Sequence, residues 1–202
     1  LPHLQGSLSA SQDQIAWALT SYIVCAAIMM PLTGWLAGHF GIKWIFIASV
    51  SCFTIASALC GAATSLTELV VFRAMQGMAG AGLIPLSQAT LLRINPPERH
   101  GQAMALFGTG TILGPLTGPA LGGWLTQDYS WRWVFYINLP IGILCTVGLL
   151  FFLRQNRNMH REEFDFFGFF ALSMAIGAFQ LLLDRGAQKE RFSSIEICIQ
   201  AT

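Results

Sequence analysis

Arg73 is the residue whose type and surroundings most clearly suggest chemistry. Arg73, Gln76 and Gly77 stand at i, i+3 and i+4, so a helix places them on one face. The run 74–92 that follows is uncharged. An arginine inside a membrane helix usually faces the bundle interior or water, and it marks a functional site. The alternative is an arginine that snorkels to the membrane surface, because Glu68 lies only about 7.5 Å away along the helix. We favour the functional interpretation.

A second stretch, 108–124, combines glycine and proline within an uncharged run, although both residues ordinarily break helices. Its glycines recur at every fourth position: Gly110, Gly114, Gly118 and Gly122. Each step drifts by about 40°, so they share a face that a neighbouring helix can approach almost to backbone contact. Pro115 and Pro119 should bend the helix, which neighbouring helices in a membrane tolerate. The alternative is a packing helix with no further role.

Composition identifies the elements that must carry these residues. The 202 residues are 54% hydrophobic and 10% charged, against about 25% charged in soluble domains. Charge-free runs cover 14–42, 44–67, 74–92, 100–127, 133–153 and 166–183. Each is close to the roughly 20 residues that cross a bilayer as a helix. All six tryptophans lie near the ends of such runs, as in an interfacial aromatic belt. We therefore expect an all-α integral membrane protein.

The expected organisation is a unit over 1–153 with spans at about 15–38, 44–64, 69–92, 101–125 and 133–153. A cytoplasmic linker at 154–163, a further span at 164–184, and an extracytoplasmic loop leading into another helix at 185–202 follow. Ser65 and Glu68 fit a capping box at the start of the third span. Pro97 fits the first turn of the fourth.

Basic residues predict the orientation. The loops near 39–43, 93–99 and 154–163 carry six of them: Lys43, Arg93, Arg99, Arg154, Arg157 and Arg161. The loops at 64–68 and 126–132 carry only Arg132. The positive-inside rule places the first set in the cytoplasm. The basic loop at 184–192 is discordant with this assignment.

Several function classes lack support in the sequence. The net charge of +1 offers no basic excess for nucleic acid. The five cysteines form no CxxC pair, so neither a disulfide framework nor a metal site is implied. HExxH, GxSxG and Walker patterns are missing. We therefore expect neither an enzyme nor a cofactor.

Two motifs resemble those of a known family. The stretch "GTILGPLTGPALGG" resembles the antiporter motif on the fifth helix of drug-exporting members of the major facilitator superfamily. Its matching positions are Gly110, Gly114, Pro115, Gly118, Gly122 and Gly123, with Pro119 beside them. The resemblance implies a hinge or seal that packs against the other half of the transporter. "RAMQGMAGAG", with Arg73, Gln76 and Gly77, resembles the fourth-helix motif and implies a role in proton coupling.

A third stretch, "GWLAGHFGIK", resembles the cytoplasmic loop motif of the same superfamily. Its matching positions are Gly34, Leu36, Ala37, Gly41 and Lys43. Gly38 stands where the superfamily usually has aspartate, so the usual charged latch is in question.

Two further stretches indicate which branch of the superfamily the sequence resembles. "WRWVFYINLPIG" and "DFFGFFALSMAIGAFQLLLDRG" resemble the sixth helix and the first additional central helix of EmrB/QacA-type drug:proton antiporters, which have fourteen helices. The resemblance covers helices two to seven, an incomplete N-terminal bundle that lacks helix one and the acidic proton site expected there.

The resemblance implies proton-coupled efflux of hydrophobic or amphipathic small molecules by alternating access. The proton gradient supplies the energy, and no cofactor is involved. The partners are the substrate, protons and the lipid bilayer, and the family also allows a periplasmic adaptor protein. The location is the cell membrane, the inner one in a Gram-negative cell. Two alternatives stay open: a carrier for a small metabolite, and a membrane scaffold without transport.

Overall fold

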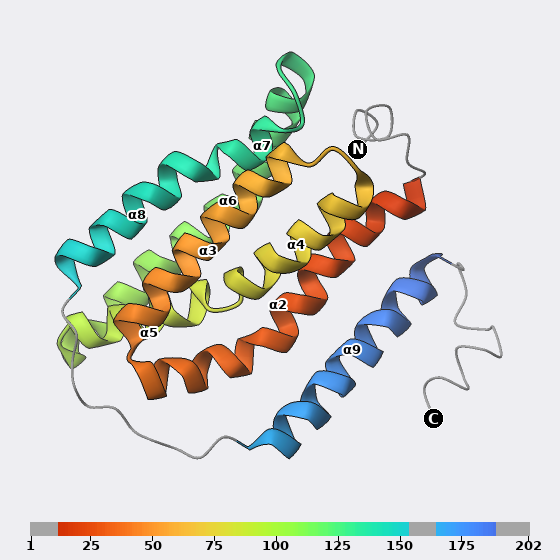
Figure 1. Cartoon of the computed structure of the whole chain (residues 1–202). Coiled ribbons are helices and arrows are strands. Elements are labelled where there is room, and N and C mark those ends of the chain that lie inside the picture. Colours follow the sequence, from red (N-terminus) through yellow and green to blue (C-terminus); the bar gives the residue numbers. More distant parts are fainter. Residues whose placement is uncertain (1–11, 154–164, 189–202) are drawn as a thin grey trace.

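A computed structural model describes residues 12–153 and 165–188, with side chains for 17–153 and 165–179. These residues form helices and no strand. The helices are α2 (Gln12–Phe40), α3 (Ile42–Ala62), α4 (Leu66–Gly80), α5 (Leu83–Ile94), the 3-10 turn η1 (Pro97–Arg99), α6 (His100–Asp128), α7 (Trp133–Tyr136), α8 (Asn138–Phe152) and α9 (Phe166–Gln188). Figure 1 shows α8, α3, α4, α2 and α9 side by side in that order, with α6 behind α3. The predicted all-α class is confirmed.

Each predicted span coincides with a helix or a pair of helices. Four stretches of the described chain are long and apolar enough to cross a membrane: Trp17–Phe40, Ile42–Ala62, Leu66–Ile94 and Trp133–Phe152. Helix α6 has the length, with 29 residues, but its glycines, threonines and prolines lower its hydropathy. Helix α9 extends to Gln188, so 185–188, which we expected in a loop, are helical. The linker at 154–163 and the segment beyond 188 lie outside the described residues.

Two spans are interrupted, although each was predicted as one helix. The stretch 66–94 breaks at Ala81-Gly82, between α4 and α5. The stretch 133–152 breaks at Ile137, between α7 and α8. A proline follows each break: Pro85 cannot donate to the carbonyl of Ala81, and Pro140 cannot donate to that of Tyr136. The apolar pattern gives the length of a span, and each break lies one turn before a proline that cannot donate.

The connection between α2 and α3 is a single residue, Gly41, rather than the loop over 39–43 that the sequence suggested. Gly41 has φ 90°, a conformation that costs other residues energy and glycine very little. Its amide donates to the carbonyl of Ala37 at 3.0 Å, which closes the end of α2. The chain therefore reverses direction within one residue.

The predicted cap at Ser65 is present in altered form. The Ser65 hydroxyl accepts a hydrogen bond from the amide of Glu68 at 3.2 Å, as a capping box requires. The Glu68 carboxylate instead accepts from the amide of Thr64 at 2.8 Å. Pro97 begins η1, which leads directly into α6.

Buried residues form two clusters. One contains Ala18, Cys60, Ala63, Leu69, Trp131 and Phe135, and the other contains Ala37, Phe46, Val50 and Leu86. Trp17, Trp44, Trp124 and Trp133 are each about half exposed, as residues of an aromatic belt can be. Trp131 differs from the sequence expectation, because it is buried and packs edge-on against Phe135.

Candidate functional site

The structure brings Arg73 and Gln76 together in the interior of the bundle. The Arg73 Nη1 donates to Oε1 of Gln76 at 3.2 Å. Gln76 is only 2% exposed, and its Oε1 also lies 3.8 Å from the thiol of Cys60. Cys60 comes from α3, so this polar contact connects two helices. The partly buried guanidinium of Arg73 therefore contacts a buried side chain that also meets α3.

Gly77 lies on the same face and has a packing role. A Cβ at Gly77 would collide with the backbone carbonyl oxygen of Tyr22 on α2. A Cβ at Gly80 would come within 3.2 Å of the Tyr22 hydroxyl. The Ser21 hydroxyl donates to the carbonyl of Val70 at 3.3 Å across the same contact. Small residues on α4 thus let α2 approach closely, as in other membrane helix pairs.

Aromatic rings complete the surroundings of Arg73. Its Cζ lies 4.7 Å from the ring centroid of Phe135 and 5.7 Å from that of Tyr22. Ring faces attract cations, and more strongly away from water. Its Nε is buried and has no hydrogen-bond partner. Among the residues that the structure describes, no carboxylate contacts Arg73.

The loop-motif residues occupy the other end of the bundle. Gly34 and Leu36 lie within α2, and Gly41 forms the turn. Lys43, near the start of α3, donates to the carbonyl of Leu150 at 3.0 Å, close to the end of α8. A cation there complements the partial negative charge of the helix terminus. Arg93 borders a pocket with Gly34 and Gly41, so the predicted basic side is one end of the structure.

The motif of α6 has no packing partner in the described chain. Apart from the neighbouring backbone of α6 itself, no atom of the described chain lies within 4 Å of a Cβ placed at Gly110, Gly114, Gly118, Gly122 or Gly123. Helix α6 stays continuous through Pro115 and Pro119. The hydroxyl of Thr111 donates to the carbonyl of Gly108 at 2.8 Å, and that of Thr117 to the carbonyl of Leu113 at 2.7 Å. The glycine face is therefore open, and polar contacts within the helix support its backbone.

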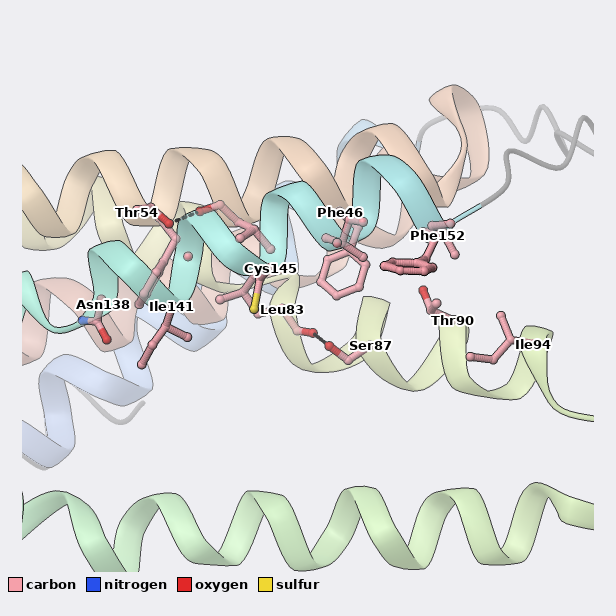
Figure 2. A pocket seen from close by; sticks show the side chains of 16 residues that line it. Phe46, Thr54, Leu83, Ser87, Thr90, Ile94, Asn138, Ile141, Cys145 and Phe152 are labelled. Carbon is pink, nitrogen blue, oxygen red and sulfur yellow. Dashed lines mark hydrogen bonds between the residues drawn. The ribbon is translucent and has the colours of Figure 1, made fainter.

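A pocket of about 560 Å³ lies between α3, α5 and α8. Figure 2 shows its lining side chains, with α6 running apart from them across the bottom of the view. The lining is largely apolar, with a few polar groups: Thr54, Ser87, Thr90 and Asn138. The hydroxyl of Thr90 is buried and has no hydrogen-bond partner. The size and lining suit a small apolar molecule or an apolar side of another helix.

Sequence reasoning missed the pocket and the polar pair behind it. The Asn138 amide donates to the hydroxyl of Ser57 at 3.0 Å, and that hydroxyl donates to the carbonyl of Phe135 at 2.9 Å. Ser57 is fully buried. An asparagine inside an apolar run was the available signal, since polar side chains join helices in membranes.

Known proteins match the chain over nearly its whole length. Residues 1–187 match the Major Facilitator Superfamily. The multidrug export protein EmrB of Haemophilus influenzae is 40% identical over 203 residues, covering 100% of this chain and 40% of EmrB. EmrB of Escherichia coli strain K12 is 42% identical over 200 residues, covering 98% and 39%. The fatty acid resistance protein FarB of Neisseria gonorrhoeae is 39% identical over 203 residues, covering 98% and 39%. The chain thus spans about 40% of the length of these relatives.

Proposed function

Because this chain belongs to the major facilitator superfamily, we propose that it is part of a proton-coupled exporter of hydrophobic or amphipathic small molecules. Relatives named for multidrug export and fatty acid resistance support this substrate class. They also indicate a multi-pass membrane transporter rather than an enzyme. Alternating access would rock this bundle against a second one around a central site. In a Gram-negative cell the location would be the inner membrane, with a periplasmic adaptor as an optional partner.

The observation that carries the proposal is the place of Arg73. The Arg73 guanidinium contacts Gln76 and two aromatic rings and has no carboxylate partner among the described residues. A charge in such a place costs stability, and a costly intramembrane charge indicates a functional role. A positive charge in a desolvated site lowers the pKa of a nearby acid and so influences proton binding and release. Arg73 and Gln76 would serve coupling, while Gly77 keeps α2 against α4.

The motif of α6 fits the same proposal. An open glycine face that meets nothing in residues 12–153 and 165–188 has room for a helix outside this chain. Close contact at this face would hold the two halves of the transporter together in one state, and loss of the contact would let them separate in the other. Lys43 and Gly41 would fix the cytoplasmic end of α2, α3 and α8 while the bundles move.

The alternatives keep the fold and change its use. A metabolite carrier or a membrane scaffold would need no gradient-driven release of hydrophobic compounds. An assay of export driven by a proton gradient distinguishes them, since only the coupled exporter expels hydrophobic compounds in this way.

The test uses everted membrane vesicles that contain the full-length transporter and a hydrophobic dye. Arg73→Ala should abolish dye transport driven by a pH gradient while leaving the amount of inserted protein unchanged. Arg73→Lys should restore transport only in part, because lysine keeps the charge and loses the planar donor fork. Normal transport by Arg73→Ala would refute a coupling role for this residue.

A further inference from the structure

The segment around α7 is conspicuous in the sequence, yet the proposed function assigns it no role. Within its residues "WRWVFYIN", Trp133–Tyr136 form the single turn α7, which Ile137 separates from α8. Two of its aromatic side chains, Trp131 and Phe135, are among the most buried in the described chain. A short turn that buries two large rings has a fixed position, so its contacts indicate what it holds.

Phe135 contacts the guanidinium of Arg73 more closely than the other ring does. Its centroid lies 4.7 Å from the Arg73 Cζ, compared with 5.7 Å for Tyr22. Phe135 is 6% exposed, so water does not weaken the attraction between ring and cation. Gln76 contacts one edge of the guanidinium, and the rings contact it from α2 and α7.

The backbone of Phe135 is itself held by α3, through a hydroxyl that α8 contacts in turn. Its carbonyl accepts a hydrogen bond from the fully buried hydroxyl of Ser57 on α3, at 2.9 Å. Asn138, the first residue of α8, donates to the same hydroxyl at 3.0 Å. Arg132 donates to the carbonyl of Gly61 near the end of α3, at 2.9 Å. These bonds fasten both ends of the turn to α3.

We infer that Phe135 is a positioning residue for Arg73. The Phe135 ring fixes where the charge of Arg73 lies, and the Ser57–Asn138 pair fixes the ring. The inference rests on the proposed role of Arg73 in coupling. It assigns to α7 the task of setting the position of that charge.

The test is Phe135→Leu in the full-length transporter, with Tyr136→Leu as the matched control. Leucine fills most of the space but has no ring face. Tyr136 is the next residue along, packs against Gly61 on α3, and is not among the rings on Arg73. Phe135→Leu should lower gradient-driven export by about twofold to about thirtyfold, the range that a cation–π contact spans. It should also shift the pH midpoint of export in the same direction as Arg73→Lys. Tyr136→Leu should leave that midpoint unchanged.

A double-mutant cycle separates positioning from packing. If Phe135 acts through the guanidinium, Phe135→Leu should cost less in the Arg73→Lys background than in the unmodified protein. Ser57→Ala, which removes the hydrogen bond from α3 to the Phe135 carbonyl, should shift the pH midpoint in the same direction by a smaller amount. Phe135→Tyr keeps the ring face and should retain the unmodified midpoint.

Equal effects of Phe135→Leu and Tyr136→Leu, or additive effects in the cycle, would overturn the inference and leave the coupling role of Arg73 intact. Normal export by Arg73→Ala would instead refute the coupling role of Arg73, whereas absence of gradient-driven export by the unmodified transporter would refute the proposed function. If Phe135→Leu does not accumulate in the membrane, Ser57→Ala and Phe135→Tyr decide the question. An unchanged midpoint in Ser57→Ala, or a shifted one in Phe135→Tyr, would then overturn it.

Discussion

At the scale of single residues, the glycines differ in how much space surrounds them. A Cβ at Gly77 would meet the backbone of α2, and one at Gly142 would meet the side chain of Thr54 on α3. A Cβ at Gly34 would meet nothing within 4 Å. Only the first two glycines are therefore required by the packing that the structure describes.

Gly77→Ala should weaken the contact between α2 and α4. The colliding atom belongs to the backbone and cannot rotate away, so we expect a loss of about 1–3 kcal/mol. The apparent melting temperature of the protein purified in detergent should fall. Gly34→Ala is the matched control and should leave it unchanged. Equal melting temperatures for the two variants would contradict the close approach at Gly77.

Gly41→Ala tests backbone strain rather than packing. Alanine at φ 90° and ψ 140° should cost about 1–3 kcal/mol. The melting temperature should fall, while substrate affinity measured well below the transition should hold. An unchanged melting temperature would show that the turn between α2 and α3 relaxes to another conformation.

The sequence predicted the grouping of Arg73, Gln76 and Gly77, because a helical period alone determines it. It did not predict the rings on Arg73. Phe135 lies far along the chain, and an aromatic residue in an apolar run has no pattern that separates a ring on a cation from a ring in the core. Such contacts depend on how α4 and α7 meet, which the sequence leaves open.

At the scale of elements, α6 presents the sharpest contrast. Its glycines repeat at helical spacing, yet none of them meets a neighbour in the described residues. Large apolar side chains on the same helix, such as Leu106 and Leu116, are also exposed, at 76% and 71%. The pattern predicted the shared face, but the occupant of that face is not encoded in α6 itself.

Gly118→Leu should impair export in the full-length transporter if this face meets another helix. A bulky side chain where backbones meet costs about 1–3 kcal/mol, enough to shift a balanced two-state equilibrium about tenfold. Ala120→Leu is the matched control, since two residues turn the helix by about 200° and place Ala120 away from the glycine face. The measurements are export, insertion and dye binding. Equal losses in both variants would show that the glycine face has no special contact.

The elements were predictable where apolarity alone defines them. The spans over α3 and α2 agree with the charge-free runs to within a few residues. The breaks at Ala81 and Ile137 were not predicted, since proline inside a membrane span is compatible with a bent helix as well as a divided one. Which one forms depends on the neighbouring helices.

At the scale of the whole molecule, the structure separates two ends. Lys43 and Arg93 lie at one end, and Arg132 lies beside the end of α3 at the other. This is the arrangement that the basic residues predicted, although the side of the membrane is not a property of the fold alone.

Reporter fusions give the orientation. A reporter fused after Arg157 should be active as a cytoplasmic protein, and one fused after Tyr129 as an extracytoplasmic protein. If both fusions report the same side, the stretch between Tyr129 and Arg157 does not make the single membrane crossing that we predict. If the Arg157 fusion reports the extracytoplasmic side and the Tyr129 fusion reports the cytoplasm, segments outside this chain determine the orientation in place of its basic loops.

The interruption at Ala81-Gly82 has a mechanical consequence. Helix α4 carries Arg73, whereas α5 carries Arg93 and one wall of the large pocket. A continuous rod would transmit any tilt at one end in full to the other, but a jointed one transmits only part of it. Helix α5 can therefore tilt when a molecule or helix occupies the pocket, while α4 keeps the Arg73 guanidinium against the rings of Tyr22 and Phe135.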